Sequence, residues 1–248
     1  MEVSNPFRQR LRDIPETELT LCRLCLRLVE WREAQSQRVP PRFREWVTAH
    51  GFWGRPVPAF GDPAAWLAVV GLAPAAQGGN RTGRVFTGER SGDFLYAALH
   101  LAGLANQAES THRGDGLELA GVLVTAAARC APPANRLLGE ELARCRPYLR
   151  ADLADLGALR VVLALGGVAH GALVALLAEQ GMAPRPKPRF AHAAEHRLPG
   201  GVWLVDSYHV SQQNTFTGRL TPQMLDGVLA RCRRLRDDAG LAERARTV

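Results

Sequence analysis

Trp66-Leu67-Ala68-Val69-Val70-Gly71-Leu72 is the stretch that decides the fold, because this short apolar run stops at glycine, proline and polar residues. Three later runs end in the same way, and they are Gly121–Ala128, Val161–Leu165 and Val202–Asp206. Short apolar runs separated by long segments of helical period are typical of parallel strands that are covered on both faces. The sequence therefore predicts an α/β fold with a four-stranded parallel sheet, whose ligands bind at the carboxyl ends of the strands.

The segments between these runs are expected to be helices and loops of a single domain, residues 1–248, because 248 residues fit one α/β core. Helices are predicted near Asp93–Leu104, Leu138–Asp155, Val168–Gly181 and Pro222–Asp238. One or two further helices are predicted within Leu11–Glu33, interrupted near Cys22 and Cys25. Irregular segments are predicted at Arg38–Asp62, Gln77–Gly92 and Asn106–Glu118.

The charge of the chain predicts a polyanionic partner, since 31 Lys and Arg against 24 Asp and Glu give a net charge of +7. An arginine-rich proteome of biased base composition would give the same excess. No apolar stretch reaches 18 residues, and the N-terminus lacks the apolar core of a secretory signal. We therefore expect a cytoplasmic protein with no membrane partner.

The spacing of the five cysteines indicates a metal or cluster site, because a cytoplasmic chain rarely keeps disulfides. Cys22 and Cys25 form C-x2-C, whereas Cys130 and Cys145 are separated by fourteen residues. A zinc ribbon would require a second C-x2-C. Four thiolates with one wide pair suit a [4Fe–4S] cluster better, although zinc and unliganded thiols remain open. Cys232 is expected to pack as a small hydrophobic residue.

Three of the strand ends and loops carry residues that suit a base-binding site. The polar run Tyr208–Leu220 places His209 at the carboxyl end of a strand, where it can donate a proton or a hydrogen bond near neutral pH, or else the run is an ordinary capping loop. The small residues of Gly71–Ala76 allow a ligand close to the backbone, or form a tight turn. Phe86 lies among glycines and arginines and suits a stacking platform for a base, or else it is a core residue.

Together these segments resemble the uracil-DNA glycosylase superfamily, specifically family 5, the iron–sulfur type B enzymes. The resemblance extends from Cys22-Arg23-Leu24-Cys25 to Gly218-Arg219-Leu220-Thr221. The motifs that carry it are Gly71-Leu72-Ala73-Pro74-Ala75, Asn80-Arg81-Thr82-Gly83-Arg84, Phe86-Thr87-Gly88, Arg129-Cys130-Ala131-Pro132-Pro133 and His209-Val210-Ser211. The resemblance implies a three-layer α/β/α sandwich and a monomer that excises uracil from double- or single-stranded DNA, leaving an abasic site.

The resemblance also implies residue roles. Phe86 would stack on the extruded base, His209 would stabilise the departing anion, and Glu89 and Asn135 would position the attacking water. The other base-binding residues would be Gly71, Ala73, Ala75 and Ser211. The DNA-binding residues would be Asn80, Arg81, Arg84, Gln212, Gln213, Asn214 and Arg219, and residues of Gln212–Phe216 would fill the gap in the stack. A structural [4Fe–4S] cluster would be held by Cys22, Cys25, Cys130 and Cys145.

The chain departs from this family and its sisters at several positions. Ala73 and Ala75 stand where sister families place a carboxylate or an amide, so the first motif supplies no side-chain base. Glu89 replaces the usual aspartate, and Gln77 stands where relatives have histidine. Ala126 occupies the position of an asparagine that reads the uracil edge in family 4. A pocket without that hydrogen bond cannot sharply reject other bases, so we expect hypoxanthine and xanthine to be accepted as well.

The sequence is also compatible with functions other than that of a glycosylase. A non-catalytic iron–sulfur DNA-binding protein on the same scaffold would share the motifs. A phosphate-binding α/β enzyme would require a glycine-rich fingerprint, which Gly71–Ala75 is not. His192 and His196 are a possible metal pair, but the sequence offers no evident third ligand. Gly166-Gly167 can seat a phosphate at a helix start, or simply allow tight packing.

Overall fold

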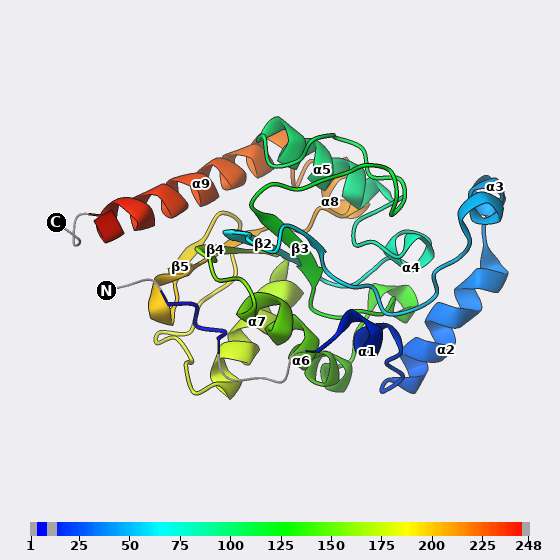
Figure 1. Ribbon diagram of the computed structural model, residues 1–248, viewed down its shortest axis with the longest axis horizontal. Coiled ribbons are helices and arrows are strands. Elements are labelled where there is room, and N and C mark those ends of the chain that lie inside the picture. The colour runs from blue at the N-terminus through cyan, green and yellow to red at the C-terminus, as the bar shows by residue number, and fades with distance from the viewer. Residues whose placement is uncertain (1–3, 9–13, 245–248) are drawn as a thin grey trace.

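The centre of the molecule is a six-stranded sheet (Figure 1), in a computed structural model that describes residues 4–8 and 14–244, but not the side chains of 239–244. Its four central strands run parallel to one another and are buried. They are β2 (Leu67–Gly71), β3 (Val122–Ala126), β4 (Val161–Leu165) and β6 (Trp203–Ser207). The predicted α/β fold with four parallel strands is confirmed.

The sheet also has two antiparallel edge strands that the sequence did not predict. The strand order is β1-β3-β2-β4-β6-β5, in which β1 (Phe60–Gly61) pairs with β3 and β5 (Glu195–Arg197) pairs with β6. The two edge strands contain only two and three residues. Segments this short carry no periodic signal, so tertiary pairing alone makes them strands.

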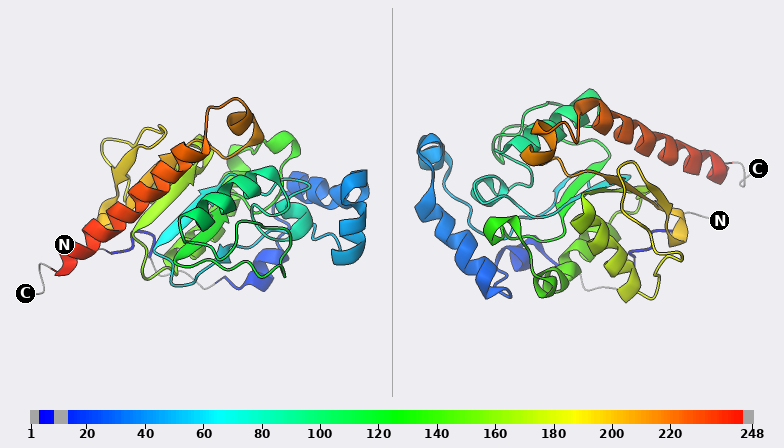
Figure 2. Two further views of the ribbon diagram at one scale, coloured as in Figure 1. Left: turned by 90° about the horizontal axis from the view of Figure 1, so that it is seen from above. Right: turned by 180° about the vertical axis from the view of Figure 1, so that it is seen from behind.

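Helices cover both faces of the sheet and complete an α/β/α sandwich (Figures 1 and 2). On one face lie α5 (Arg90–Leu101) and α9 (Pro222–Arg244), which contact each other. On the other face lie α6 (Gly139–Ala154) and α7 (Gly167–Glu179). Each pair of helices closes its own hydrophobic core against the strands.

Alternation along β2 divides its side chains between these two cores. Leu67 and Val69 are buried with the residues of α5 and α9, whereas Ala68 and Val70 are buried with those of α6 and α7. Successive side chains of a strand point to opposite faces, so a strand covered on both sides is apolar throughout. This explains why the strands are visible in the sequence as unbroken apolar runs.

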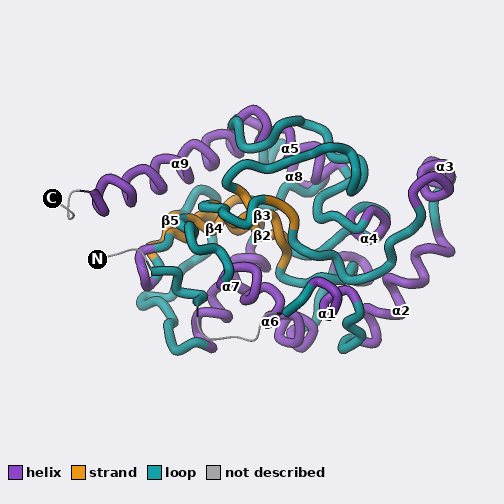
Figure 3. Tube along the Cα trace, viewed as in Figure 1, coloured by secondary structure: helices purple, strands orange, loops and turns teal. Residues whose placement is uncertain are grey.

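The first three α-helices, which end at His50, form a helical arm beside the sheet (Figures 1 and 3). The predicted interruption at the C-x2-C pair is confirmed, since α1 (Glu16–Thr20) and α2 (Leu26–Ala34) flank it. Leu11 to Asp13, the start of that prediction, lie outside the described residues. The irregular segment predicted at Arg38–Asp62 is wrong in part, because η1 (Gln35–Arg38) leads into α3 (Pro41–His50). Helix α3 has no fully buried residue, and its apolar side chains Phe43, Trp46 and Val47 are half-buried.

Several short helices lie in segments that were expected to be loops. They are α4 (Gly79–Thr82), η2 (Pro133–Asn135), η3 (Pro199–Gly201) and α8 (Gln212–Phe216). The last helix, α9, begins as predicted, with the backbone N–H of Met224 3.3 Å from Thr221 Oγ1, and extends to Arg244. Within the described ranges, no helix has both the length and the apolar character needed to cross a membrane.

Candidate active site

An aromatic ring lies directly on the carboxyl end of the central strand β2. A Cβ atom placed on Gly71 would lie 2.6 Å from Phe86 Cζ, so only glycine leaves room for the ring. Ala126, the last residue of β3, pairs with Gly71 in the strand register, and the two positions therefore face the same side of the sheet. The Phe86 ring therefore rests on Gly71, and Ala126 lies beside Gly71 on the neighbouring strand.

The backbone of Phe86 is held in an unusual conformation. Its φ is +51°, a left-handed value that is unfavourable for a bulky residue and persists only where neighbours enforce it. A side chain at Gly92 would collide with the carbonyl oxygen of Phe86. On the other side, the Tyr96 hydroxyl donates a hydrogen bond of 2.9 Å to the carbonyl of Val85. Phe86 is therefore a fixed platform.

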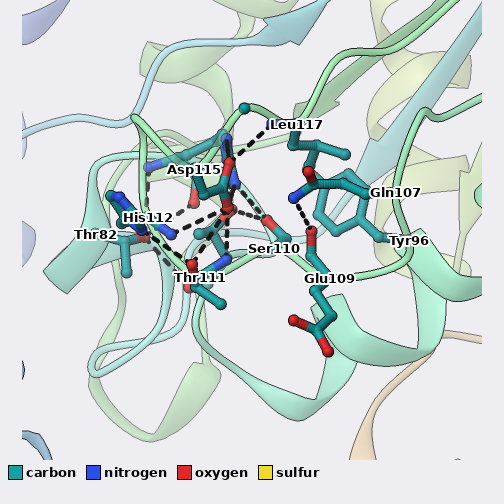
Figure 4. A network of polar contacts seen from close by, with 12 residues as sticks. Thr82, Tyr96, Gln107, Glu109, Ser110, Thr111, His112, Asp115 and Leu117 are labelled. Carbon is teal, nitrogen blue, oxygen red and sulfur yellow. Dashed lines mark hydrogen bonds and ion pairs between the residues drawn. The ribbon is translucent and has the colours of Figure 1, made fainter.

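A buried ion pair between Arg84 and Asp115 anchors the same loop to residues 106–118, and Figure 4 shows the polar contacts around Asp115. The Arg84 guanidinium donates to both carboxylate oxygens of Asp115, at 2.9 and 2.5 Å. It also donates to Ser110 Oγ at 2.8 Å and to Thr87 Oγ1 at 2.9 Å. Although burial opposes it, hydrogen bonds from Arg84 and from three backbone N–H groups hold the pKa of Asp115 well below its usual range. Asp115 thus remains ionised opposite Arg84.

His209 lies beside this platform at the end of β6. The centroids of its imidazole and of the Phe86 ring are 6.2 Å apart, with the ring planes inclined by 38°. Gly166 (φ +96°) makes room for it, since a Cβ atom there would lie 3.1 Å from His209 Cβ. The Asn214 amide donates a 2.8 Å hydrogen bond to the His209 carbonyl. Burial lowers the pKa of His209 to about 4, so near neutral pH the ring is uncharged and keeps one N–H donor.

Glu89 lies next to the turn that follows β2. A Cβ atom on Gly78 would lie 2.5 Å from the Glu89 carboxyl carbon, so the carboxyl group rests on the backbone there. Both residues line a cavity of about 560 Å³ together with Ala75, Gln77 and Gln212. Burial, and secondarily the charge of Asp93, raises the pKa of Glu89 to about 8 against the opposing effect of Arg81. Glu89 is therefore largely protonated at pH 7.

The remaining residues of the expected chemical site lie at different places. Ala73 follows β2 and Ser211 precedes α8, and both are half-buried at the carboxyl edge of the sheet. Asn135 is exposed in η2 with a φ of +55°. It is not among the residues that line the cavity beside Glu89. The role of Asn135 in positioning water stays a prediction.

Three residues expected to contact DNA are inside the protein instead. The exposed fractions of Asn80, Arg81 and Arg84 are 0%, 2% and 3%, which corrects that prediction. The Asn80 amide donates to the carbonyl of Arg32 in α2 at 3.1 Å. It thereby fastens the loop after β2 to the helical arm. Arg84 is occupied by its buried ion pair.

The Arg81 side chain is likewise engaged in contacts inside the protein. Its guanidinium donates to the carbonyls of Gln77, at 2.7 Å, and Gly88, at 3.0 Å. The same group lies 4.2 Å from the ring centroids of both Phe43 and Trp46 in α3. Cation–π contacts of this kind are stronger when they are shielded from water. Arg81 thus joins the arm to the loop that carries Phe86 and Glu89.

The segment after His209 is exposed, as the DNA-contact prediction requires. Gln212 and Gln213 are exposed on α8, whereas the Asn214 side chain binds the His209 carbonyl. Phe216, also in α8, is 67% exposed, and no sequence argument distinguished it from its neighbours. Arg219 is exposed, with its guanidinium 4.6 Å from the Tyr208 ring centroid.

The four predicted ligand cysteines come together at the base of the helical arm. All of them line one cavity, although they come from the α1–α2 turn, the segment after β3 and helix α6. An Arg32 N–H donates to Cys130 Sγ at 2.8 Å, and the Arg129 backbone N–H donates to Cys145 Sγ at 3.2 Å. Burial raises the pKa of the Cys130 thiol to about 11 and that of Cys145 to about 12, against the effect of these arginines.

The separation of the sulfur atoms distinguishes between the possible groups. All four cysteines are described, and no three of their Sγ atoms lie within 4.8 Å of one another. A zinc ion with four thiolates holds neighbouring sulfurs roughly 3.8 Å apart. An iron–sulfur cluster is larger and accepts N–H hydrogen bonds at its sulfurs. The donor set fits a cluster better than zinc. The fifth cysteine, Cys232, is fully buried in the core, as predicted.

A parallel sheet with an aromatic ring, an uncharged imidazole and a shielded carboxyl group near its carboxyl edge is typical of α/β proteins that bind a ligand at that edge. A family model described as the uracil DNA glycosylase superfamily matches residues 58–233. The chain belongs to the uracil-DNA glycosylase superfamily.

Curated relatives agree with this assignment over most of their length. A type-5 uracil-DNA glycosylase of Thermus thermophilus is 51% identical over 217 residues, which cover 88% of this chain and 94% of the relative. One of Mycobacterium leprae is 46% identical over 225 residues, covering 90% and 95%. One of Pyrobaculum aerophilum is 44% identical over 224 residues, covering 90% and 91%.

Proposed function

We propose that this chain is a type-5 uracil-DNA glycosylase, a hydrolase that removes uracil from DNA and leaves an abasic site. The observation that carries the proposal is the position of the Phe86 ring beside the His209 imidazole, with 6.2 Å between their centroids. The family and the printed names of the relatives support the same activity. In a parallel sheet, this edge is where a ligand is bound.

The base must leave the helix before it can be attacked. Extrusion costs a few kcal/mol of stacking and pairing, and least for a mismatched base or a single strand. The extruded uracil stacks against Phe86. As the N-glycosidic bond breaks, positive charge develops on the sugar and negative charge on the base. The N–H of neutral His209 donates a hydrogen bond to the base oxygen where that charge accumulates, which lowers the barrier.

The water must be held by groups other than the first motif. Ala73 and Ala75 offer no polar side chain. Glu89 lines the adjoining cavity, and its carboxylate form can orient a water molecule toward the sugar. Asn135 is the second group that we propose for this role, and it would have to approach the bound DNA from the exposed turn η2. Stabilisation of the leaving group therefore supplies most of the catalysis.

The direct test is single-turnover excision of uracil by the variant His209→Ala. Loss of a preset donor to a developing anion costs roughly 3–4 kcal/mol, so we expect a hundred- to thousand-fold slower reaction with unchanged DNA affinity. His100→Ala, on the outer side of α5, is the matched control and should react like wild type. A wild-type protein that binds uracil-containing DNA without cutting it would favour the non-catalytic iron–sulfur DNA-binding protein instead.

We further propose that the enzyme accepts hypoxanthine and xanthine besides uracil. Ala126 is buried at the floor of the site and offers no hydrogen bond to the edge of a base. The variant Ala126→Asn should lower excision of hypoxanthine relative to uracil by about tenfold or more, measured on matched oligonucleotides. An unchanged ratio, or a wild-type enzyme confined to uracil, would contradict this specificity.

We propose that a structural [4Fe–4S] cluster is bound by Cys22, Cys25, Cys130 and Cys145. The spread of these sulfurs and the N–H donors of Arg32 and Arg129 support it. When bound, the cluster supplies a cross-link between the helical arm and the sheet, and no electron transfer. Cys145→Ser should lower iron and sulfide in protein purified without oxygen, whereas Cys232→Ser should not. Equal iron in both variants would reject this ligand set.

We also propose that a monomer acts on DNA in the cytoplasm, at the nucleoid. Phe86, Glu89 and His209 all come from one chain, so the site needs no second copy. Light scattering of the purified protein should therefore give a single species near 27.0 kDa. A stable dimer at the concentrations used for assays would contradict the monomer.

A further inference from the structure

Three side chains outside the glycosylase site converge near the carboxyl end of β6. They are His170 from α7, His196 from β5 and Asp206 from β6. One potential ligand atom from each lies within 4.8 Å of the others, and within the described part of the chain no other such group of three histidine, cysteine or carboxylate residues occurs. The residues are distant in sequence, so only the fold assembles them.

The contacts among them leave two polar atoms unsatisfied. His170 Nδ1 is 2.9 Å from Asp206 Oδ1, a normal hydrogen bond. His196 Nε2 is 3.5 Å from Asp206 Oδ2, and neither of these two buried atoms has a hydrogen-bond partner among the described residues. The exposed fraction of Asp206 is 0%. A carboxylate oxygen buried without a partner is unfavourable, which points to a missing cation between the two groups.

We propose that His170, His196 and Asp206 bind a divalent cation of the zinc type. Zinc–ligand bonds of roughly 2.0–2.2 Å in tetrahedral geometry place neighbouring ligand atoms roughly 3.3–3.5 Å apart. The observed separations are 2.9 Å from His170 Nδ1 to Asp206 Oδ1 and 3.5 Å from His196 Nε2 to Asp206 Oδ2, so each imidazole lies within a few tenths of an ångström of that range from one of the two carboxylate oxygens. Two imidazoles and a carboxylate are a ligand set that suits zinc.

The surroundings of the three residues fit such a site. The second ring nitrogen of His170 lies 3.2 Å from the carbonyl oxygen of Pro188, the kind of outer hydrogen bond that orients a metal-bound histidine. His196 lines an open cavity of about 910 Å³, through which the ion enters and from which a water molecule completes the coordination. Arg185 and Arg197 border the same cavity, so an anion can replace this water.

The position of the ion assigns it a structural role. It joins α7 to the pair β5–β6 three residues before His209. The Phe190 ring contacts both sides of this region, because its centroid is 5.8 Å from that of His170 and 6.4 Å from that of Tyr208, the residue before His209. A metal that binds the folded form alone stabilises it by mass action. At a zinc concentration of 100 times the Kd, we expect the melting temperature to rise by roughly 5–10 °C.

The test uses tag-free, iron-loaded protein titrated with Zn²⁺, with iron and zinc counted separately. We expect one zinc per chain with unchanged iron, and an X-ray absorption spectrum with only nitrogen and oxygen ligands at about 2.0 Å. His196→Gln should weaken zinc binding by about 100-fold or more, because a direct ligand matters more than an outer hydrogen bond. His192→Gln, four residues earlier on the same segment, is the matched control and should bind zinc as wild type.

Other outcomes would overturn the site. Sulfur ligands at about 2.3 Å would assign the zinc to the cysteines. Equal zinc affinity in His196→Gln would exclude this residue as a ligand. Nitrogen NMR that finds both ring nitrogens of His170 protonated in the presence of zinc would leave a hydrogen-bonded imidazolium and carboxylate in place of a metal. Uracil excision is measured independently, so failure of this proposal is distinguishable from failure of the glycosylase assignment.

Discussion

The two loops that carry the halves of the proposed base site are built in opposite ways. The loop of residues 77–92 presents Phe86 from the interior, and its arginines at 81 and 84 point into the protein. The segment of residues 208–219 carries His209 and then runs along the surface, where most of its polar and aromatic side chains are exposed. One loop holds its aromatic ring in place from the interior, and the other leaves most of the side chains that follow His209 exposed.

The difference shows that an arginine serves either purpose according to what surrounds it. Arg84 forms an ion pair with the buried carboxylate of Asp115, 31 positions further along the chain, so its charge is neutralised inside the protein. Arg219 lies over the face of the Tyr208 ring and is exposed, so we propose that its guanidinium binds a phosphate. Rigidity on the side of the base and accessibility on the side of the duplex are thus assigned to separate segments.

The largest effect is expected from breaking the platform's anchor. Asp115→Ala leaves the Arg84 charge buried and unpaired, which should lower the free energy of unfolding by roughly 3–5 kcal/mol in urea titrations. Glu16→Ala removes the partner of the exposed Arg113 instead, at 3.4 Å, and should cost at most about 1 kcal/mol. Equal losses in the two variants would mean that the buried pair is not an anchor.

The next effect concerns the exposed aromatic ring of α8. We expect Phe216 to enter the gap left by the extruded base, where an aromatic contact is worth about 1–3 kcal/mol. Phe216→Ala should therefore slow excision from duplex DNA by about 5- to 100-fold, with little change on single strands. Phe216→Leu keeps an apolar wedge and should retain most of the rate. A similar loss on both substrates would exclude the wedge.

A smaller effect should appear as a pH dependence that belongs to Glu89. With a pKa of about 8, its carboxylate fraction rises about tenfold between pH 7 and pH 9, and the single-turnover rate should rise with it. Because the folded protein holds this proton and the unfolded chain releases it near 4.5, stability should fall as the pH rises from about 4.5 to 8.

The variant Glu89→Gln isolates that contribution. It should abolish both the rise in rate and the part of the stability loss that depends on this proton. A pH profile identical to that of wild type would assign the titration to another group. Asp93→Asn is the companion variant, since removal of the neighbouring charge should shift the profile to lower pH.

The smallest effect is expected from a single exposed arginine. Arg219→Ala should weaken binding of DNA of any sequence, and the slope of log K against log salt should decrease by about one contact. Arg231→Ala is the control, because that arginine is exposed but already paired with Glu195. If both variants change the slope equally, the segment after His209 has no special role in phosphate binding.

Much of the fold was predictable, because the four central strands are buried on both faces and therefore consist of nearly unbroken runs of apolar residues. Phe86 and His209 each stand out from the composition around them, and the structure brings these two candidates side by side, although their roles stay predictions. The arm helix α3 was not found, because it is short, begins at a pair of prolines and half-buries its apolar residues Phe43, Trp46 and Val47 without placing any of them in the core. The edge strands were too short for any pattern.

The errors at the site share one physical cause. Whether an arginine is a surface charge or a buried one depends on its partner, and Asp115 looks like any other loop aspartate in the sequence. The same limit explains the third member of the His170–His196–Asp206 group. Asp206 belongs to an apolar run and gave no sign that two histidines from other elements would face it.

The ring that rests on Gly71 also restricts how this enzyme can change its preference among damaged bases during evolution. Every side chain at position 71 would displace the platform itself, so that route is closed. The neighbouring position 126 already bears a methyl group and can lengthen toward the incoming nucleotide. New selectivity should therefore arise by substitutions on strand β3, while strand β2 stays as it is.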